Sequence, residues 1–462
     1  MSARARPCLV SVLAFALALA APGPVFGTHV VLITIDTLRP DHLSCYGYER
    51  PTSPWIDALS VDGLRFETAY STSSWTPPAM ASVMTSLHAR DHGVTHGLVD
   101  AKTVIEQEVL QDTLTTLAEV LKAAGYRTFG VSTTAHLTLE QGFAQGFDRF
   151  ECLPFRDARA AREAVGRWRL EILRSPKAFV WIHLFDPHDP YIPRMPQAAR
   201  FDPLILSSRD LRLRGTLREI REMWAKEALP PDPARPEVSL LRAAYDSEIG
   251  YADEELARLF RDLDLGADRL IVLTSDHGEA FFEHGHLGHG QNLHEELVRI
   301  PMIVSPPAAF AMRGVVRTPV SLLDVMPAIL EVAGASMPAG AQGASLFETA
   351  RRERSGGPST DRAFFAELWD QNPGADEREW KMIRRGSEKL HVRMGTEETL
   401  LFDLRADPLE RVDRSAHAPE RVAALRAELA AWIKQGRPER RTPTIRVSEE
   451  TREKLRSLGY ID

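Results

Sequence analysis

An acidic residue, Asp36, closes the first long apolar run that follows the N-terminal segment. The run is His29-Val-Val-Leu-Ile-Thr-Ile-Asp36, and a continuous apolar run of this length predicts a strand buried on both faces of a parallel sheet. Its carboxylate would then lie at the carboxyl edge of the sheet, where open α/β sheets bind ligands. A capping aspartate would show the same pattern, so Asp36 alone does not establish a site.

A second apolar run, residues 269–275, ends in Asp276-His277-Gly278-Glu279. A carboxylate and an imidazole that are adjacent at a strand end can both bind one divalent cation, and Gly278 permits the turn that directs them. Together with Asp36 they predict a metal site with three protein ligands and an open position. The alternative is a capping aspartate beside an unrelated histidine, and the second strand-end aspartate makes the metal site the favoured interpretation.

A hydroxyl group stands at the start of a predicted helix. Thr76 precedes Pro77 and further helix-forming residues up to Thr85, which predicts Thr76 at the N-cap and Pro77 at the first helical position. Thr76 could serve only as a cap. A helix N-terminus also binds anions through free N–H groups and its dipole, and a metal-bound hydroxyl there would be a nucleophile toward a tetrahedral oxyanion.

The segments around these motifs predict the elements that position them. Strands that alternate with helices indicate an α/β fold, with a large, mostly parallel sheet between two layers of helices. Residues 193–236, rich in proline and charge, predict an insertion over the site. The predicted strands are residues 29–36, 128–132, 178–185, 269–275 and 301–304, and the predicted helices are residues 114–124, 161–173 and 242–263.

The sequence predicts four parts. In residues 1–27, Arg4 and Arg6 come first, followed by a short apolar run and then by small residues. This order is typical of a secretory signal peptide. The run of about 13 apolar residues is too short for a bilayer span of about 20. We therefore expect export to the periplasm or the medium and no stable membrane span after cleavage. The other parts are a catalytic domain (28–350), a small C-terminal α+β subdomain of antiparallel strands and a helix (363–436), and a charged tail (437–462).

Composition limits the possible partners. A net charge of -8 and a pI near 6.0, without any basic block, exclude nucleic acid and an anionic membrane surface as the expected partner. Outside the predicted signal peptide the chain has Cys45 and Cys152. A disulfide between them is possible in an oxidising compartment, but two partly buried free thiols are the favoured interpretation.

These motifs together resemble the sulfatase family of the alkaline phosphatase superfamily, from about His29 to Asp403. The resemblance implies the expected fold and a site with one divalent ion. It rests on Asp36-Thr-Leu-Arg-Pro-Asp-His-Leu-Ser-Cys-Tyr-Gly47, Thr76 with Thr85 and His92-Gly93-Val94, Gly146-Phe147-Asp148, Asp186-Pro-His188-Asp-Pro-Tyr191, Ser275-Asp276-His277-Gly278-Glu279, Arg299-Ile-Pro301 and Phe402-Asp403-Leu-Arg-Ala-Asp407-Pro408.

The resemblance also implies a set of metal ligands. These are Asp36, Asp276 and His277, with the hydroxyl of Thr76 completing the shell. Sulfatases often carry a second acidic ligand beside the first, but here that neighbour is Thr37, and Asp41 is a weak substitute. Fewer oxygens and one imidazole favour zinc or manganese over the calcium of typical sulfatases.

Four further residues are implied to act on the substrate. His188 matches a family histidine that contacts the bound anion and could protonate the leaving oxygen. Arg39 would steady an ester oxygen. His136 and His289 lie where sulfatases carry substrate-binding residues. Thr134 replaces the lysine that accompanies His136 in sulfatases, and a purely structural role for His136 is equally plausible. A second metal is a further alternative, with ligands from His284, His286, His289, His294, Asp186 and His188, but the Asp-Pro-His-x-Pro-Tyr spacing favours one metal.

The chain departs from sulfatases at the nucleophile. Active sulfatases convert a cysteine or serine to formylglycine within Cys/Ser-x-Pro-Ser/Ala-Arg, whereas this chain has Thr76-Pro77-Pro78-Ala79-Met80. Threonine cannot give the aldehyde, because oxidation at its β-carbon would give a ketone. Threonine is the nucleophile in superfamily members that resemble nucleotide pyrophosphatases and phosphoethanolamine transferases.

The sequence therefore predicts a metal-dependent hydrolase of sulfate or phosphate esters, carried by small molecules or glycans, with Thr76 as nucleophile. One alternative is a pseudo-sulfatase that binds anionic glycans without turnover. Loss of the formylglycine motif favours this alternative, and the retained ligands Asp36, Asp276 and His277 disfavour it. The other is a phospho-group transferase, which usually carries several transmembrane helices that this sequence does not predict.

Overall fold

A computed structural model describes residues 27–96, 98–100, 105–203, 232, 234–357, 361–369, 379–396, 398–436, 442–447 and 452–453. The predicted signal peptide, apart from Gly27, lies outside these residues, as do residues 204–231 of the predicted insertion and most of the predicted tail. Within the described ranges no helix is long and apolar enough to span a bilayer. Cys45 and Cys152 are partly buried free thiols, which confirms the favoured interpretation.

A nine-stranded sheet forms the centre of the molecule, in the order β12-β2-β11-β8-β1-β7-β5-β6, with β13 also paired to β2. Only β11 runs antiparallel to its neighbours, so the predicted mostly parallel sheet is confirmed. The strands are β1 (His29–Ile35), β2 (Leu64–Tyr70), β5 (Arg127–Ser132), β6 (Arg149–Cys152), β7 (Ala178–Leu184), β8 (Arg269–Ser275), β11 (Arg299–Ser305), β12 (Gly314–Val316) and β13 (Val320–Ser321).

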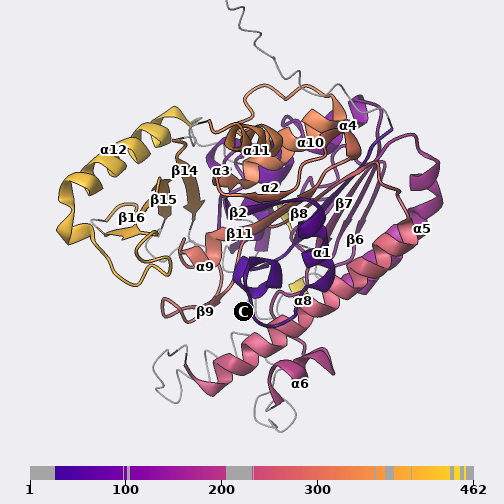
Figure 1. Ribbon diagram of the computed structural model, residues 1–462. Helices are drawn as coiled ribbons and strands as arrows, with labels where there is room; N and C mark the ends of the chain where they lie inside the picture. Colours follow the sequence, from indigo (N-terminus) through magenta and orange to yellow (C-terminus); the bar gives the residue numbers. More distant parts are fainter. Residues whose placement is uncertain are drawn as a thin grey trace, which may run out of the picture.

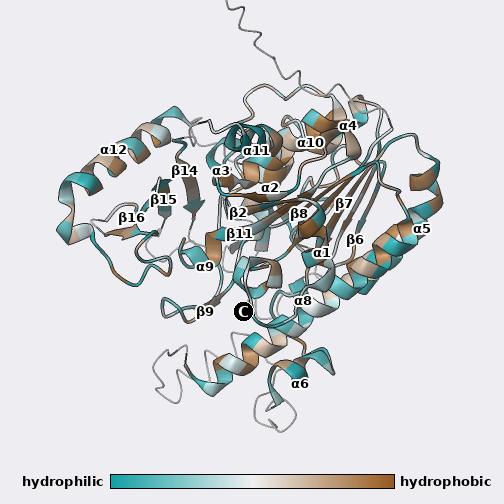
Figure 2. Cartoon of the chain, viewed as in Figure 1, coloured by the Kyte–Doolittle hydropathy of each residue, from teal (hydrophilic) through white to brown (hydrophobic). Residues whose placement is uncertain are grey.

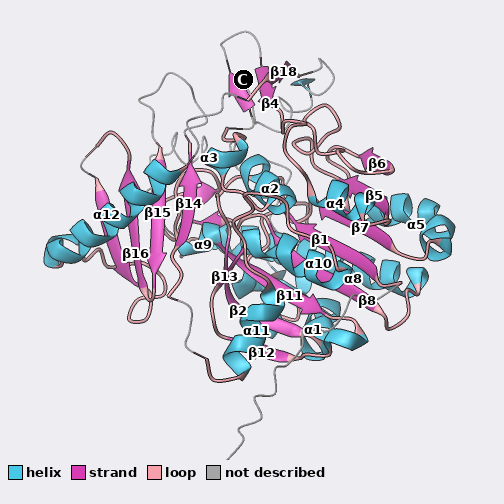
Figure 3. Cartoon of the chain, turned by 90° about the horizontal axis from the view of Figure 1, so that it is seen from above, coloured by secondary structure: helices cyan, strands magenta, loops and turns pink. Residues whose placement is uncertain are grey.

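Helices cover both faces of this sheet (Figures 1 and 3). Alternate residues of β1 enter opposite cores, because successive side chains of a strand point to opposite faces: Val30 and Leu32 into one, Val31 and Ile33 into the other. Figure 2 shows the apolar residues concentrated on the central strands. The first core is covered by α2 (Thr76–Thr85), α4 (Leu117–Ala123), α10 (Val325–Ala333) and α11 (Leu346–Arg354), and the second by α1 (Pro54–Asp62), α5 (Ala158–Arg174) and α8 (Pro236–Leu263).

A four-stranded antiparallel sheet follows, with α12 on one face, as expected for the C-terminal subdomain. The helix packs through Leu425 and Leu429 on Ile383 and Leu390. The opposite face meets the catalytic domain at Tyr70, Leu293 and Val298. The elements are β14 (Phe364–Leu368), β15 (Trp380–Arg385), β16 (Glu388–Arg393), β17 (Thr399–Asp403) and α12 (Pro419–Gln435).

Short elements complete the fold. Part of the predicted tail forms β18 (Thr444–Arg446), which pairs with β4 (Ile105–Glu108) in a small sheet with β3 (Leu98–Asp100). The sequence did not predict the pairing of β18 with β4, because these two segments are far apart in the chain. The remaining short elements are α3 (Ala89–His92), α6 (Gln197–Phe201), α9 (Glu295–Val298), β9 (Ala280–Phe281) and β10 (Leu287–Gly288).

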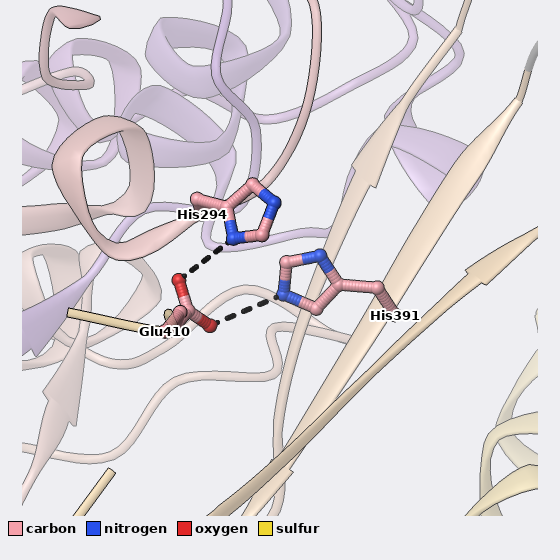
Figure 4. A group of neighbouring side chains, drawn as sticks. All are labelled: His294, His391 and Glu410. Atoms are coloured by element: carbon pink, nitrogen blue, oxygen red, sulfur yellow. Dashed lines mark hydrogen bonds and ion pairs between the residues drawn. The ribbon is translucent and has the colours of Figure 1, made fainter. Parts of the chain in front are cut away.

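The buried carboxylate of Glu410 joins the subdomain to the catalytic domain (Figure 4). Its Oε2 accepts the Glu295 N–H at 2.6 Å and lies 3.1 Å from Nδ1 of His294. Its Oε1 lies 3.0 Å from Nζ of Lys389 and 3.4 Å from Nε2 of His391. The two histidines and Glu410 are close enough to hold a metal ion. The ammonium of Lys389 already supplies a cation here, so we interpret the group as an ion-paired interdomain link.

Replacing Glu410 with glutamine should lower the free energy of unfolding by about 3–5 kcal/mol, because a broken buried ion pair leaves a poorly compensated charge. Urea denaturation measures the change. Glu398→Gln is the matched control, since Glu398 pairs with Arg393 on the surface and surface pairs contribute about 0–1 kcal/mol. Equal effects of the two variants would contradict the structural importance of Glu410.

The link should weaken in mild acid. Burial lowers the pKa of His294 to about 4, so this imidazole is neutral when folded at pH 6 but binds protons near pH 6.5 when unfolded. Its contribution to stability is therefore present above about pH 6.5 and is lost as the pH falls toward 4. His294→Gln should make the fall of the unfolding free energy with pH shallower, by up to about 1.4 kcal/mol per pH unit. An unchanged slope would contradict this.

Candidate active site

Neighbouring strands bring Asp36 and Asp276 together. In the parallel register of β1 and β8, Ile35 lies opposite Ser275, so the residues that follow each strand share the carboxyl edge of the sheet. Both carboxyl groups are fully buried. Burial raises the pKa of Asp36 well above its ordinary value, and the nearby charges of Asp276 and Glu279 raise it further. Burial also acts to raise the pKa of Asp276, but the nearby imidazoles of His277 and His183 outweigh this effect, so that the pKa of Asp276 is lowered instead. A proton or a cation between the two carboxyl groups would relieve their repulsion.

The turn after β1 is held in a strained conformation. Thr37 has φ of 56°, a left-handed conformation that is costly for a β-branched residue. Three hydrogen bonds fix it: Thr37 N–H donates to Asp276 Oδ1 at 3.2 Å, Leu38 N–H donates to Ser275 Oγ at 2.9 Å, and the Tyr245 hydroxyl donates to the Thr37 carbonyl at 2.7 Å. The turn therefore sets the position of Asp36 relative to Asp276.

Thr76 enters the site from helix α2, which covers the first core of the sheet. Helix α2 begins at Thr76 with Trp75 as its N-cap, so the predicted N-cap position of Thr76 was wrong by one residue. The hydroxyl makes no capping bond; it lies 3.1 Å from Nε2 of His277 and 3.5 Å from Oδ1 of Asp36. The expected anion site of free N–H groups is also reduced, because Pro77 and Pro78 have none and Ala79 donates to the Trp75 carbonyl.

The ligating atoms fit one small cation. Nε2 of His277 lies 3.7 Å from Oδ1 of Asp36 and 3.5 Å from Oδ2 of Asp276, and adjacent ligands around a tetrahedral zinc are about 3.4 Å apart. Nδ1 of His277 lies 2.9 Å from the Gly278 carbonyl, which leaves Nε2 for a metal. Oδ2 of both aspartates is buried and has no hydrogen-bond partner among the residues that the structure describes. The residues present therefore suit the predicted metal.

The imidazoles of His136, His188 and His289, which were predicted from the sequence to act on the substrate, lie near Thr76 and His277. The ring of His289 is 4.5 Å from that of His277 and 4.8 Å from that of His188. Nδ1 of His289 lies 2.9 Å from Oε1 of Glu279, which is fully buried. The ring of His136 packs 5.6 Å from that of Trp75. Burial lowers the pKa of His188 to about 3 and that of His136 to about 4, so both are neutral near pH 7.

Arg39 does not fit its expected role. Its guanidinium donates to both oxygens of Asp41, to the Glu279 carbonyl and to Oε1 of Glu283. The carboxylates of Asp41 and Glu283 compensate its charge, and its donors already have partners within the protein. Arg39 therefore braces the loop, and Asp41 is its ion-pair partner rather than a replacement metal ligand.

The described residues do not form the alternative second metal site. Asp186 accepts the Ala158 N–H at 2.7 Å and an N–H of Arg194 at 2.9 Å, so both of its oxygens are engaged. His284 pairs with Glu296, and His294 with Glu410. His188 and His289 lie beside one another, and His289 lies beside His277, whereas His284 and His294 stack on each other at the Glu410 link.

Three residues of the site had no role in the prediction from sequence. His183 in β7 is fully buried with Nε2 3.6 Å from Oδ2 of Asp36. Glu279 was part of a recognised motif but had no assigned role, and Trp75 lies between His136 and His289. A histidine inside a strand buried on both faces is the signal that could have identified His183, because such strands are otherwise apolar.

Comparisons with known proteins identify the family of the chain. The model of the sulfatase family matches residues 28–335, and the model described as N-sulphoglucosamine sulphohydrolase, C-terminal, matches residues 283–437. The chain is 22% identical to the uncharacterized sulfatase YidJ of Escherichia coli (strain K12) over 67% of this chain and 68% of that protein. It is 34% identical to arylsulfatase A of Homo sapiens, over 32% of this chain and 28% of that protein.

Solved structures share the fold. BT4656, determined in complex with its substrate D-glucosamine-2-N,6-O-disulfate, superposes with a TM-score of 0.71 at 20% identity over 89% of this chain and 99% of that chain. The phosphonate monoester hydrolase of Agrobacterium radiobacter gives 0.68 at 21% identity over 89% of this chain and 96% of that chain. With a family match over most of its length and this architecture around Asp36 and Asp276, the chain belongs to the sulfatase family.

Proposed function

We propose that the protein is a metal-dependent hydrolase of phosphate-type esters in which the hydroxyl of Thr76 is the nucleophile. One observation carries the proposal: Oγ1 of Thr76 lies within 3.1–3.5 Å of His277 and Asp36, two of the three residues suited to hold the metal. We also propose that the protein is exported, on the basis of residues 1–27. Sulfate esters are the second candidate substrate, because sulfatases share this family.

Asp36, Asp276 and His277 would hold the cation, with Thr76 as a fourth ligand. A bound divalent ion would supply Lewis acidity and lower the pKa of the hydroxyl at this position. Oγ1 of Thr76, whose proton passes to solvent, would form a bond to phosphorus while the bond from phosphorus to the leaving oxygen breaks and that oxygen takes a proton. Attack by water on the resulting phosphothreonine releases the phosphoryl group and restores the hydroxyl.

His289 and Glu279 supply the proton transfers. The carboxylate of Glu279 orients the imidazole through Nδ1, which leaves Nε2 for the leaving oxygen in the first step and for water in the second. Tyr191 donates a hydrogen bond of 2.8 Å to the other oxygen of Glu279 and fixes this carboxylate. His188 presents a second imidazole beside His289.

The charges around Thr76 favour a monoanionic substrate. Carboxylates neutralise Arg39, and Thr134 and His289 occupy segments in which sulfatases carry lysines. A phosphodiester or phosphonate monoester carries one negative charge and needs less compensation than a phosphate monoester dianion. The structural similarity to a phosphonate monoester hydrolase supports this substrate class.

Removal of the nucleophile gives the direct test. Thr76→Ala should lower kcat/KM for a bis-aryl phosphate by about 10³-fold or more, because no other hydroxyl replaces the nucleophile. Thr76→Ser is the matched control and should keep most of the activity. Assays with bis-aryl phosphate, aryl phosphate and aryl sulfate, each with zinc, manganese and calcium, identify the substrate class. Full activity of Thr76→Ala would refute the assignment of Thr76 as the nucleophile.

The proposed acid–base pair predicts a dependence on the leaving group. His289→Gln and Glu279→Gln should each lower kcat/KM, which reports the step that expels the leaving group, by about 10²–10⁴-fold for esters of poorly acidic alcohols. The loss should be smaller for nitrophenyl esters, whose leaving groups need no proton. His96→Gln is a control at a histidine that pairs with Glu108. The double variant should be little worse than either single variant. Losses that are equal for both kinds of ester would contradict a proton-transfer role.

A further inference from the structure

A fully buried histidine, His183, faces the two site carboxylates from β7. Its ligating nitrogen and one carboxylate oxygen each of Asp36 and Asp276 all lie within 4.8 Å of one another. The pairing of β7 with β1 produces this placement, since His183 lies opposite Thr34, two residues before Asp36. His183 therefore enters the site from a third strand end, beside those of β1 and β8.

Three buried polar atoms converge here without hydrogen-bond partners among the described residues: Oδ2 of Asp36, Oδ2 of Asp276 and Nε2 of His183. The distance of 3.6 Å from Nε2 of His183 to Oδ2 of Asp36 exceeds a hydrogen bond. An unsatisfied buried polar atom costs about 1–3 kcal/mol. A cation placed between these atoms would satisfy all three at once.

Neighbouring side chains favour the required tautomer of His183. Oγ1 of Thr34 lies 2.8 Å from Nδ1 of His183, accepts the indole N–H of Trp181 at 3.1 Å, and lies 3.5 Å from the Ile182 carbonyl. When the hydroxyl of Thr34 donates to that carbonyl, its oxygen accepts a hydrogen bond from the Nδ1–H of His183. Nε2 then carries a lone pair toward the carboxylates, as metal-binding histidines require.

We propose that His183 is a direct ligand of the site metal, which rests on the metal dependence proposed above. The shell then contains Asp36, Asp276, His277 and His183, with Thr76 as the exchangeable group. His183 would supply the donor that Thr37 does not provide. Two imidazoles favour zinc over calcium or manganese, because nitrogen donors suit zinc and oxygen donors suit the other two.

X-ray absorption at the zinc edge tests this on the purified full-length protein loaded with one equivalent of zinc. Scattering from imidazole rings counts the histidine ligands, and we expect two in the wild-type protein. His183→Gln should show one imidazole and bind zinc about 100-fold more weakly in a chelator competition. His391→Gln, a buried histidine of the interdomain link, is the control and should leave two imidazoles and the affinity unchanged.

The outcomes separate the two proposals. One imidazole in wild-type protein, or an unchanged zinc affinity in His183→Gln, overturns the role of His183 and leaves the catalytic proposal in place. No binding of zinc, manganese or calcium by the wild-type protein overturns both. If His183→Gln does not fold, the imidazole count of the wild-type protein decides the question.

Discussion

Two carboxylates buried side by side are the constraint on which the site depends. The sheet places Asp36 and Asp276 at neighbouring strand ends, with full burial, where their repulsion is strong and water cannot screen it. Hydrogen bonds keep the two carboxylates from moving apart. The turn after Asp36, in which Thr37 is left-handed, is held by the bond from Leu38 N–H to the hydroxyl of Ser275 and by the bond from the phenol of Tyr245 to the Thr37 carbonyl. The energetic cost of this arrangement is consistent with a site shaped to receive a cation.

Both helix layers contribute to the same point. Helix α2 on one face is completely buried, so its first residue, Thr76, cannot move away from the sheet edge. Helix α8 on the other face supplies Tyr245, which braces the Thr37 turn. The hydroxyl of Thr76 and the carboxylates are therefore fixed by opposite cores of one sheet, and close-packed cores permit little relative movement.

The sequence predicted the parts of the site whose signal is local. A strand buried on both faces appears as an apolar run, and the polar residue that ends it marks the sheet edge, which identified Asp36, Asp276 and His277. The proposed role of His183 as a metal ligand depends on the neighbouring strand, since the pairing of β7 with β1 places His183 close to Asp36. The ion pair of Arg39 was hidden for the same reason, because its partner Glu283 lies far along the chain. The β18–β4 pairing was likewise invisible to local patterns.

One segment connects the active site with the C-terminal subdomain. Between β10 and β11 the chain places His289 beside His277 and then His294 and Glu295 on the carboxylate of Glu410. Lys389 of the subdomain sheet completes that contact with ion pairs to both Glu295 and Glu410. The subdomain therefore anchors the loop that carries the proposed acid–base histidine. A small antiparallel sheet outside the central sheet thus restricts the position of His289 relative to Thr76 through the buried charges of Glu410 and Lys389.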